Sequence, residues 1–253
     1  MASSKIPVDG QILGIDIGAT NIKFCHVDHR GEMLEVIRRR PTPYPCTPTR
    51  LVAVLSRRII SAQCPQVGVG FPGEFADGYV VRPGNLSRPG GIGTDRDPGL
   101  DQKWRGFALQ EALCESTQRD VRVVNDAALA GLGCCSGKGT ELVLTLGTGL
   151  GLALEVEGRP KKVRDVGAAP FLEGRTYDEV LGERARTRDE ALWHRSLGLA
   201  VAGFSEEFGA GTVHLAGGNA RRVSPKSFAG SPFRVVINGN EAPLRGVAKL
   251  FYG

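Results

Sequence analysis

The stretch ILGIDIGATNIKF, residues 12–24, decides the fold of the first half of this chain. Apolar and β-branched residues flank the short segment Gly18-Ala19-Thr20, which predicts two strands joined by a tight turn. Glycine permits positive φ angles and lets backbone N–H groups come close to a ligand. Successive N–H groups in such a turn form a concavity that suits anions, and Thr20 adds a hydroxyl donor. The stretch therefore predicts a strand hairpin with a phosphate-binding turn.

The stretch LVLTLGTGLGL, residues 142–152, repeats this layout in the second half of the chain. Its turn is Gly147-Thr148-Gly149, again with glycine and a threonine hydroxyl. Repetition of a strand–turn–strand module after roughly half the chain indicates a duplicated α/β lobe. Two phosphate-binding turns in one chain make phosphoryl transfer the leading functional hypothesis.

The composition is that of an ordinary globular protein. The 253 residues are 41% hydrophobic and 23% charged, enough for one large domain or two modest lobes. The net charge of +5 leaves two interpretations open: a surface slightly rich in arginine, or a basic groove for a polyanion. The runs at 38–40 and 221–222 are short and typical of solvated faces. The sequence contains no long basic run interleaved with aromatic residues, which is the pattern typical of nucleic-acid binding.

Cysteine spacing and the N-terminal residues bear on location and metal content. The six cysteines form no C-x-x-C pair, and no histidine falls at zinc spacing with them, so we expect no structural zinc site. Residues 1–10 are polar, and no window is long and apolar enough to span a bilayer. We therefore expect a reduced, cytoplasmic protein without membrane association. A DNA-binding repressor is not expected, because no helix-turn-helix domain fits before Gly14.

Hydrophobic periodicity predicts strands at 12–17, 21–27, 32–37, 67–71, 121–124, 141–146, 150–156, 213–216 and 233–237, and helices at 48–61, 107–116, 183–207 and 241–251. Asp77-Gly78 is typical of a two-residue hairpin turn. Residues 68–73 match G-x-G-x-x-G, but Pro72 donates no N–H and no helix is expected to follow. We therefore interpret this match as unrelated to dinucleotide binding and place Pro72-Gly73 beside a substrate.

Asp16 ends the first predicted strand immediately before the turn. A carboxylate there can hold a hydrated Mg²⁺ against a phosphate. The alternative is an aspartate that accepts hydrogen bonds from turn N–H groups, which is a common structural role. Thr20 and Lys23 follow at a spacing that also serves phosphate, which favours the metal role for Asp16.

Asn125-Asp126 lies where a predicted strand passes into a predicted helix. Asn and Asp are preferred N-caps, so a structural role stands beside the functional one. In the functional interpretation Asp126 takes a proton from a substrate hydroxyl, and Asn125 orients a neighbouring hydroxyl. A second junction, Gly217-Gly218-Asn219, follows a strand. Its glycines allow a nucleotide base or ribose to approach the backbone, and a tight strand-to-helix turn is the alternative.

Taken in order, these segments resemble the ROK family of sugar kinases, within the actin/hexokinase-like superfamily, and among them the polyphosphate glucokinase branch. The resemblance spans about residues 11–251 and rests on segments 16–23, 124–127, 146–151, 174–182 and 215–220. It implies a two-lobed actin/hexokinase-like (ribonuclease H-like) α/β fold with a cleft between the lobes. The expected first lobe is 1–119 with a closing helix in 239–253, and the second lobe is 120–238.

The resemblance also implies roles for individual residues. Phosphoryl transfer would run from ATP or inorganic polyphosphate to a hydroxyl of a sugar or sugar-like polyol, with Mg²⁺ at Asp16 and Asp126 as general base. The implied phosphate contacts are Gly18, Ala19, Thr20, Lys23, Gly147, Thr148 and Gly149. The implied nucleotide contacts are Gly217, Gly218 and Asn219, and the implied acceptor contacts are Gly73, Asn125, Asp165 and Asp178. A homodimer and lobe closure that excludes water are further implications.

The chain departs from the family pattern at the sugar site. The family has Glu-x-Gly-His there, whereas this chain has Asp165-Val166-Gly167-Ala168-Ala169. Asp165 is one methylene shorter than glutamate, and Ala168 and Ala169 supply no imidazole. Each unpaired polar group at such a site costs about 1–3 kcal/mol, so glucose should bind weakly.

Three hypotheses follow for the function. The first is a kinase for an atypical acceptor such as an amino sugar or a cyclitol. The second is an ordinary glucokinase or polyphosphate glucokinase that tolerates the changes. The third is a kinase-derived, non-catalytic ligand-binding protein, against which the presence of Asp126 argues.

Overall fold

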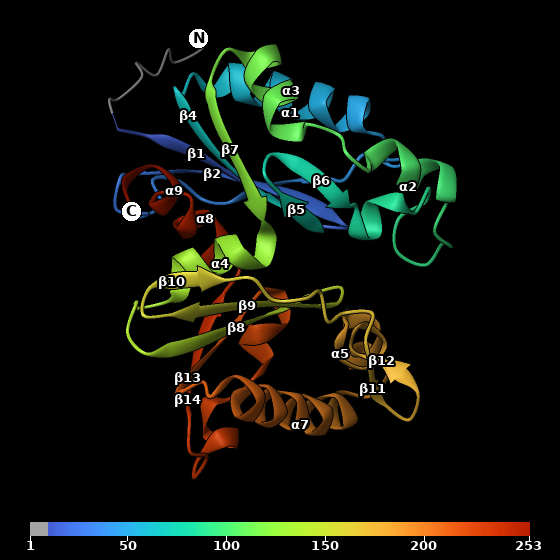
Figure 1. Cartoon of the computed structure of the whole chain (residues 1–253), viewed down its shortest axis with the longest axis vertical. Helices are drawn as coiled ribbons and strands as arrows, with labels where there is room; N and C mark the ends of the chain where they lie inside the picture. Colours follow the sequence, from blue (N-terminus) through green and yellow to red (C-terminus); the bar gives the residue numbers. More distant parts are fainter. Residues whose placement is uncertain (1–9) are drawn as a thin grey trace. The chain divides into compact units, whose positions relative to one another are not determined.

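The computed structural model describes residues 10–253, which divide into two compact units. The first unit contains residues 10–126 and 247–253, and the second contains residues 127–246. Each unit is built on one five-stranded mixed sheet with helices packed against it (Figure 1). The α/β class expected from the sequence is therefore confirmed.

The sheet of the first unit has the strand order β3-β2-β1-β4-β7. Strands β1, β2 and β3 are antiparallel neighbours, whereas β1, β4 and β7 run parallel. The elements are β1 (Ile12–Ile17), β2 (Asn21–Val27), β3 (Arg38–Pro41), α1 (Pro48–Ala62), β4 (Gln66–Phe71), β5 (Glu74–Ala76), β6 (Tyr79–Arg82), η1 (Gly84–Ser87), α2 (Pro98–Trp104), α3 (Leu109–Thr117), β7 (Asp120–Asn125) and α9 (Lys249–Tyr252). The expected Asp77-Gly78 turn joins β5 to β6, with positive φ at both residues.

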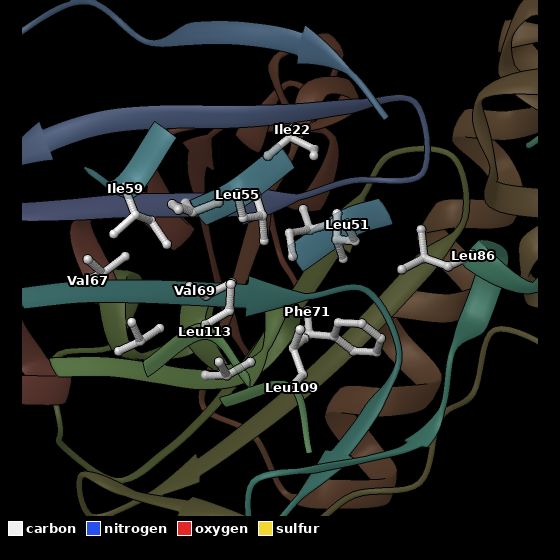
Figure 2. Packing of buried hydrophobic residues seen from close by; sticks show 14 of the residues in the cluster. Ile22, Leu51, Leu55, Ile59, Val67, Val69, Phe71, Leu86, Leu109 and Leu113 are labelled. Atoms are coloured by element: carbon white, nitrogen blue, oxygen red, sulfur yellow. The ribbon is translucent and has the colours of Figure 1, made fainter. Parts of the chain in front are cut away.

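Helices α1 and α3 cover one face of this sheet. Leu51, Leu55 and Ile59 of α1 are fully buried at helical spacing and pack with Val67 and Val69 of β4 (Figure 2). The opposite face of β4 carries glycine because the C-terminal segment lies against it: a Cβ at Gly68 would come within 2.6 Å of Val247. Close packing against Val247 therefore explains Gly68, the first glycine of the G-x-G-x-x-G match, without any role in dinucleotide binding.

The second unit repeats the same sheet plan. Its strand order is β10-β9-β8-β13-β14, with β8, β9 and β10 antiparallel and β8, β13 and β14 parallel. The elements are α4 (Asp126–Cys134), β8 (Thr140–Leu146), β9 (Leu150–Val156), β10 (Arg159–Lys161), β11 (Pro170–Leu172), β12 (Arg175–Thr176), α5 (Tyr177–Leu181), α6 (Glu183–Arg188), α7 (Glu190–Phe208), β13 (Thr212–Ala216), η2 (Gly218–Arg222), η3 (Pro225–Phe228), β14 (Arg234–Gly239) and α8 (Ala242–Gly246). Helix α7 packs on one face of this sheet, and α4 and α8 pack on the other.

Several expected boundaries need correction. Strand β7 pairs in parallel with β4, so residues 120–126 belong to the first unit and not to a second lobe beginning at 120. The closing segment in 239–253 divides into α8 and α9, and only 247–253 belongs to the first unit. Of the strand expected at 32–37, only Met33 bridges to β2, opposite Val27, and regular pairing resumes at β3.

The long helix expected at 183–207 is interrupted at Asp189. This residue has an extended backbone, with φ −152° and ψ 93°, and its carboxylate accepts a hydrogen bond from Leu192 N at 2.8 Å. A strong N-cap therefore starts a new helix, α7, inside a continuous amphipathic pattern. In residues 10–253, no helix combines the length and the apolar character that crossing a membrane requires.

Helices α4 and α8 meet through two glycines, which sets a testable requirement. A Cβ at Gly133 would lie 1.9 Å from the carbonyl oxygen of Ala242, and one at Gly246 would lie 2.0 Å from that of Leu129. We expect Gly133→Ala to lower the free energy of unfolding by about 1–3 kcal/mol, because backbone must move to admit the methyl group. Urea unfolding measures this change. Gly203→Ala in α7 is the control, since nothing lies within 4 Å of its Cβ, and it should not destabilise the protein; equal effects of the two substitutions would contradict the packing argument.

Candidate active site

The first glycine turn is held from the side by residues that follow β3. Thr42 donates its hydroxyl to Gly18 O at 2.7 Å and its N–H to Thr20 O at 3.0 Å. The Tyr44 hydroxyl donates to Ala19 O at 2.7 Å. The carbonyl groups of the turn are therefore engaged, while the Thr20 side chain is exposed and makes no hydrogen bond to any described residue. A Cβ at Gly18 would lie 2.8 Å from Asn21 O, so the turn requires glycine there.

Asp16 and Lys23 face each other across β1 and β2. They are cross-strand partners, and Lys23 Nζ lies 2.7 Å from Asp16 Oδ2. Only 5% of Asp16 is exposed, so the ammonium group compensates a buried carboxylate. The second carboxylate oxygen of Asp16 makes no hydrogen bond within residues 10–253. One carboxylate oxygen beside the first glycine turn fits Mg²⁺, which proteins commonly hold through one or two carboxylates plus substrate phosphates.

Asn125 and Asp126 lie at the end of β7, where the strand passes directly into α4. Asn125 pairs with Phe71 in the sheet, and its Nδ2 donates to Gly73 O at 2.8 Å. A Cβ at Gly73 would lie 2.3 Å from Arg82 O, so this position also requires glycine. The structure therefore brings together Gly73 and Asn125, two of the residues implied for the acceptor. Asp126, the first residue of α4, is partly exposed and directly follows Asn125 in the sequence.

The second glycine turn is fixed by three other elements of its unit. Leu150 N donates to Asp178 Oδ1 at 2.8 Å, and Gly147 O accepts from Glu183 N at 2.9 Å and from Asn219 Nδ2 at 3.2 Å. A Cβ at Gly149 would lie 2.1 Å from Asp178 Oδ1. As in the first turn, a carbonyl group is engaged and the threonine side chain, here Thr148, has no hydrogen bond to a described residue.

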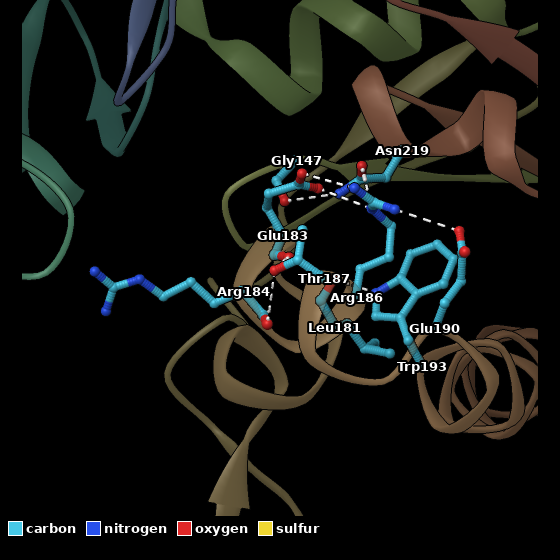
Figure 3. A network of polar contacts seen from close by, with 9 residues as sticks. All are labelled: Gly147, Leu181, Glu183, Arg184, Arg186, Thr187, Glu190, Trp193 and Asn219. Atoms are coloured by element: carbon cyan, nitrogen blue, oxygen red, sulfur yellow. Dashed lines mark hydrogen bonds and ion pairs between the residues drawn. The ribbon is translucent and has the colours of Figure 1, made fainter.

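A polar network joins this turn to the segment Gly217–Asn219 (Figure 3). Arg186 of α6 donates through Nε to Asn219 Oδ1 at 3.1 Å, and through Nη2 to Glu183 Oε1 at 2.8 Å. The hydrogen bond from Arg186 is the largest cause that lowers the pKa of Glu183. Asn219 is 7% exposed and is oriented from both ends, since its Oδ1 accepts from Arg186 and its Nδ2 donates to Gly147. The amide therefore ties the second turn to the Gly217–Asn219 segment.

Gly217 and Gly218 differ in what they require. Gly217 has φ +89°, and a Cβ there would lie 2.4 Å from Leu146 O, so close packing and backbone conformation both demand glycine. A Cβ at Gly218 would make only ordinary contact with the side chain of Asn240, at 3.7 Å, so packing does not demand glycine there.

The loop that departs from the family pattern is tied to Asp178. Gly167 O accepts from Asp178 N at 2.9 Å, and a Cβ at Gly167 would lie 2.7 Å from Asp178 Oδ1. Asp165 accepts from Gly167 N at 3.1 Å, and Asp165 and Ala168 are exposed. The neighbouring acid, Glu179, forms a capping box with Thr176 at the start of α5. Asp178 thus connects the second glycine turn to the loop at 165–169, whereas Glu179 has a purely local role.

A separate buried cluster lies at the start of β8. Glu141 accepts hydrogen bonds from Ser136 N, Ser136 Oγ, Gly137 N and His214 Nε2 at 2.7–3.1 Å. Burial raises the pKa of Glu141, but these hydrogen bonds outweigh burial and lower the pKa to about 2. Potential ligand atoms of Cys135, Glu141 and His214 lie within 4.8 Å of one another. Because the carboxylate already accepts four hydrogen bonds, the cluster is explained as the anchor of the loop that follows α4.

Some residues of the site carried no signal in the sequence analysis. Thr42 and Tyr44 brace the first turn from a distance of 24 and 25 residues, and Arg186 reaches Asn219 across 33. Nothing in their local sequence marks them. Asp189 is the one local signal, because an aspartate N-cap there ends α6 and makes it a separate helix from α7. Helix α6 carries Arg186, and its first residue, Glu183, donates its N–H to Gly147 O in the second turn.

Comparison with known proteins finds solved structures with a similar fold. The Inorganic Polyphosphate/ATP-Glucomannokinase of Arthrobacter sp. strain KM is 27% identical, with a TM-score of 0.74 over 96% of this chain and 98% of that one. A ROK family glucokinase from Streptomyces griseus, solved with glucose and AMPPNP, has the same fold, with a TM-score of 0.70 over 95% of this chain and 99% of that one, at 20% identity.

A curated glucokinase of Halalkalibacterium halodurans is 27% identical in an alignment over 165 residues, and the match covers 59% of this chain. The match spans 45% of that relative's length. The model of the ROK family matches residues 12–164, which is more than half of the chain and includes both glycine turns and Asn125-Asp126. This chain therefore belongs to the ROK family.

Proposed function

We propose that this protein is a kinase that transfers a phosphoryl group from ATP or polyphosphate to a hydroxyl of a sugar or sugar-like polyol. The observation that carries the proposal is the shared construction of the two turns. In each, neighbouring side chains or backbone groups engage the carbonyls, and a threonine side chain remains without a hydrogen bond to a described residue. The names of the relatives, glucokinase and polyphosphate/ATP-glucomannokinase, support the same reaction.

In this mechanism the turns bind the donor phosphates through N–H groups and the hydroxyls of Thr20 and Thr148. Asp126 accepts the proton of the acceptor hydroxyl as its oxygen forms a bond to the terminal phosphorus. The bond from that phosphorus to the bridging oxygen breaks, and the shortened donor leaves with the bonding electrons. Asn125, fixed by Gly73, orients the acceptor. Mg²⁺, held by Asp16, would neutralise charge on the donor phosphates.

The acceptor is proposed to be something other than glucose. Asp165 is short and bonded to its own loop through Gly167 N, and Ala168 offers no imidazole. A site that lacks these hydrogen-bond partners should favour an acceptor with different polar groups, such as an amino sugar or a cyclitol. The names of the two 27%-identical relatives favour the second candidate, a kinase for glucose or mannose.

A panel of hexoses, amino sugars and cyclitols, assayed with ATP and with polyphosphate, tests the proposal. We expect turnover of at least one acceptor, with kcat/KM for glucose at least ~100-fold below the best. The double variant Asp165→Glu, Ala168→His restores the family pattern and should raise kcat/KM for glucose. Turnover of glucose by the unmodified protein at the rate of the best acceptor would contradict the atypical acceptor and favour the second candidate.

A further inference from the structure

Strand β3 carries three consecutive arginines along the edge of the first sheet. Arg38, Arg39 and Arg40 are all exposed, and β3 pairs only with β2. Arg39 lies opposite Lys23, so it shares a face with the Lys23–Asp16 pair. Arg38 and Arg40 project toward the other face. From the sequence alone, this short run is typical of a solvated face.

This strand leads directly to the first glycine turn. Thr42, two residues after Arg40, bonds to both Gly18 O and Thr20 O. Extended chain rises about 3.3 Å per residue, so Arg40 and Arg38 follow Thr42 at intervals of about 7 Å. An anion that begins at the turn and continues along β3 would meet Arg40 first and Arg38 next.

A fourth arginine joins them from α1. The guanidinium carbon of Arg58 lies 5.7 Å from the ring centroid of Phe24, which is the cross-strand partner of Arg38. Burial is the largest cause that lowers the pKa of Arg58; the positive charges of Arg38 and Arg40 lower it further, whereas the negative charge of Glu35 raises it. Its Nη2 is shielded from solvent and has no hydrogen-bond partner among residues 10–253.

Little negative charge compensates these arginines. Glu35 lies 3.0 Å from Arg38 Nη2, and the same carboxylate is already bonded to His26. No carboxylate of the described residues lies within 4 Å of the guanidinium of Arg39, Arg40 or Arg58. Adjacent like charges without a counter-charge destabilise a surface, and an anion that binds several of them removes the penalty.

We propose that Arg38, Arg40 and Arg58, here termed the arginine track, bind the tail of a condensed phosphate chain whose terminal phosphoryl group lies at the Gly18–Thr20 turn. This inference rests on the proposed function for the role of the turn and extends it to donor length. A polyphosphate chain carries negative charge on every unit beyond the turn. A nucleoside triphosphate instead continues into ribose and base, which the arginine track does not suit.

The test compares long-chain polyphosphate, tripolyphosphate and ATP as donors for the variant Arg38→Gln, Arg40→Gln. We expect KM for long-chain polyphosphate to rise about tenfold or more, because two charge-assisted contacts are lost. KM for tripolyphosphate and ATP should change less than about twofold. The salt dependence of KM for the long chain should also weaken. Arg159→Gln, Arg188→Gln removes the same charge from exposed positions of the second unit and is the control.

A direct binding measurement separates this inference from the proposed function. Anisotropy of labelled long-chain polyphosphate should show tight binding that the track variant weakens and the control does not, whether or not any acceptor is phosphorylated. If the protein binds long-chain polyphosphate in this way but phosphorylates no acceptor, the proposed function is wrong and the binding role of the arginine track is supported. Three results would overturn the proposal: an equal rise in KM for all three donors, an unchanged KM for long-chain polyphosphate, or displacement of the labelled polyphosphate by single-stranded RNA as effectively as by unlabelled polyphosphate.

Discussion

We expect Asp126→Asn to lower kcat by about 10²–10⁴, the usual contribution of a general base. Asparagine has nearly the same shape as aspartate and is also favoured at the start of a helix, so α4 should form normally. The amide cannot take up the proton of the acceptor hydroxyl, whereas donor binding at the glycine turns does not need that carboxylate. The loss should therefore fall on kcat, with the dissociation constant of the donor unchanged.

Single-turnover kinetics and donor binding by calorimetry measure the two quantities separately. Asp120→Asn is the matched control, since Asp120 is exposed at the opposite end of β7 and should tolerate the change. Equal kcat for Asp126→Asn and the unmodified protein would remove Asp126 from the mechanism. A loss of kcat accompanied by a similar loss in the free energy of unfolding would assign the residue a structural role at the helix start instead.

The second large effect concerns stability, and we expect Glu141→Gln to cost about 3 kcal/mol at neutral pH. The pKa of Glu141 falls from 4.5 to about 2 in the folded state, and each pKa unit corresponds to about 1.4 kcal/mol. A glutamine amide can accept fewer of the four hydrogen bonds and directs its own N–H groups toward donors. The stabilisation comes from the ionised carboxylate, which the variant lacks.

The pH dependence of this effect has a definite sign. Because the folded-state pKa lies below the unfolded one, the contribution is fully present above about pH 4.5 and disappears as the pH falls toward about 2. Urea unfolding should therefore show that the difference in the free energy of unfolding between the variant and the unmodified protein is smaller in acid than at neutral pH. Glu206→Gln, an exposed change on α7, should show no such difference at either pH. A difference independent of pH would contradict the assignment to Glu141 ionisation.

Local features of this fold could be predicted from the sequence because local patterns determine them. The hairpin around Gly18 and the one around Gly147 follow from apolar alternation and glycine, and each forms within about a dozen residues. The Pro48 start of α1 follows from Thr47, which caps it. The repeat of these modules also indicated the duplicated sheet plan.

The remaining features depend on contacts that no local pattern encodes. Asp178 lies 28 residues from Leu150, and Asn219 lies 72 residues from Gly147, so their hydrogen bonds to the second turn appear only in the folded chain. The boundary between the units follows from the pairing of β7 with β4, which the strand's own residues do not specify. Arg58 joins the arginines of β3 only because α1 packs on the sheet beside Phe24.

Phosphorus NMR of the protein with Mg²⁺, a donor and the acceptor panel tests the central claim most directly. The account predicts a new phosphomonoester signal with at least one sugar or polyol, and no such signal with Asp126→Asn over the same period. Inorganic phosphate as the only product, or an unchanged donor with every acceptor, would contradict it.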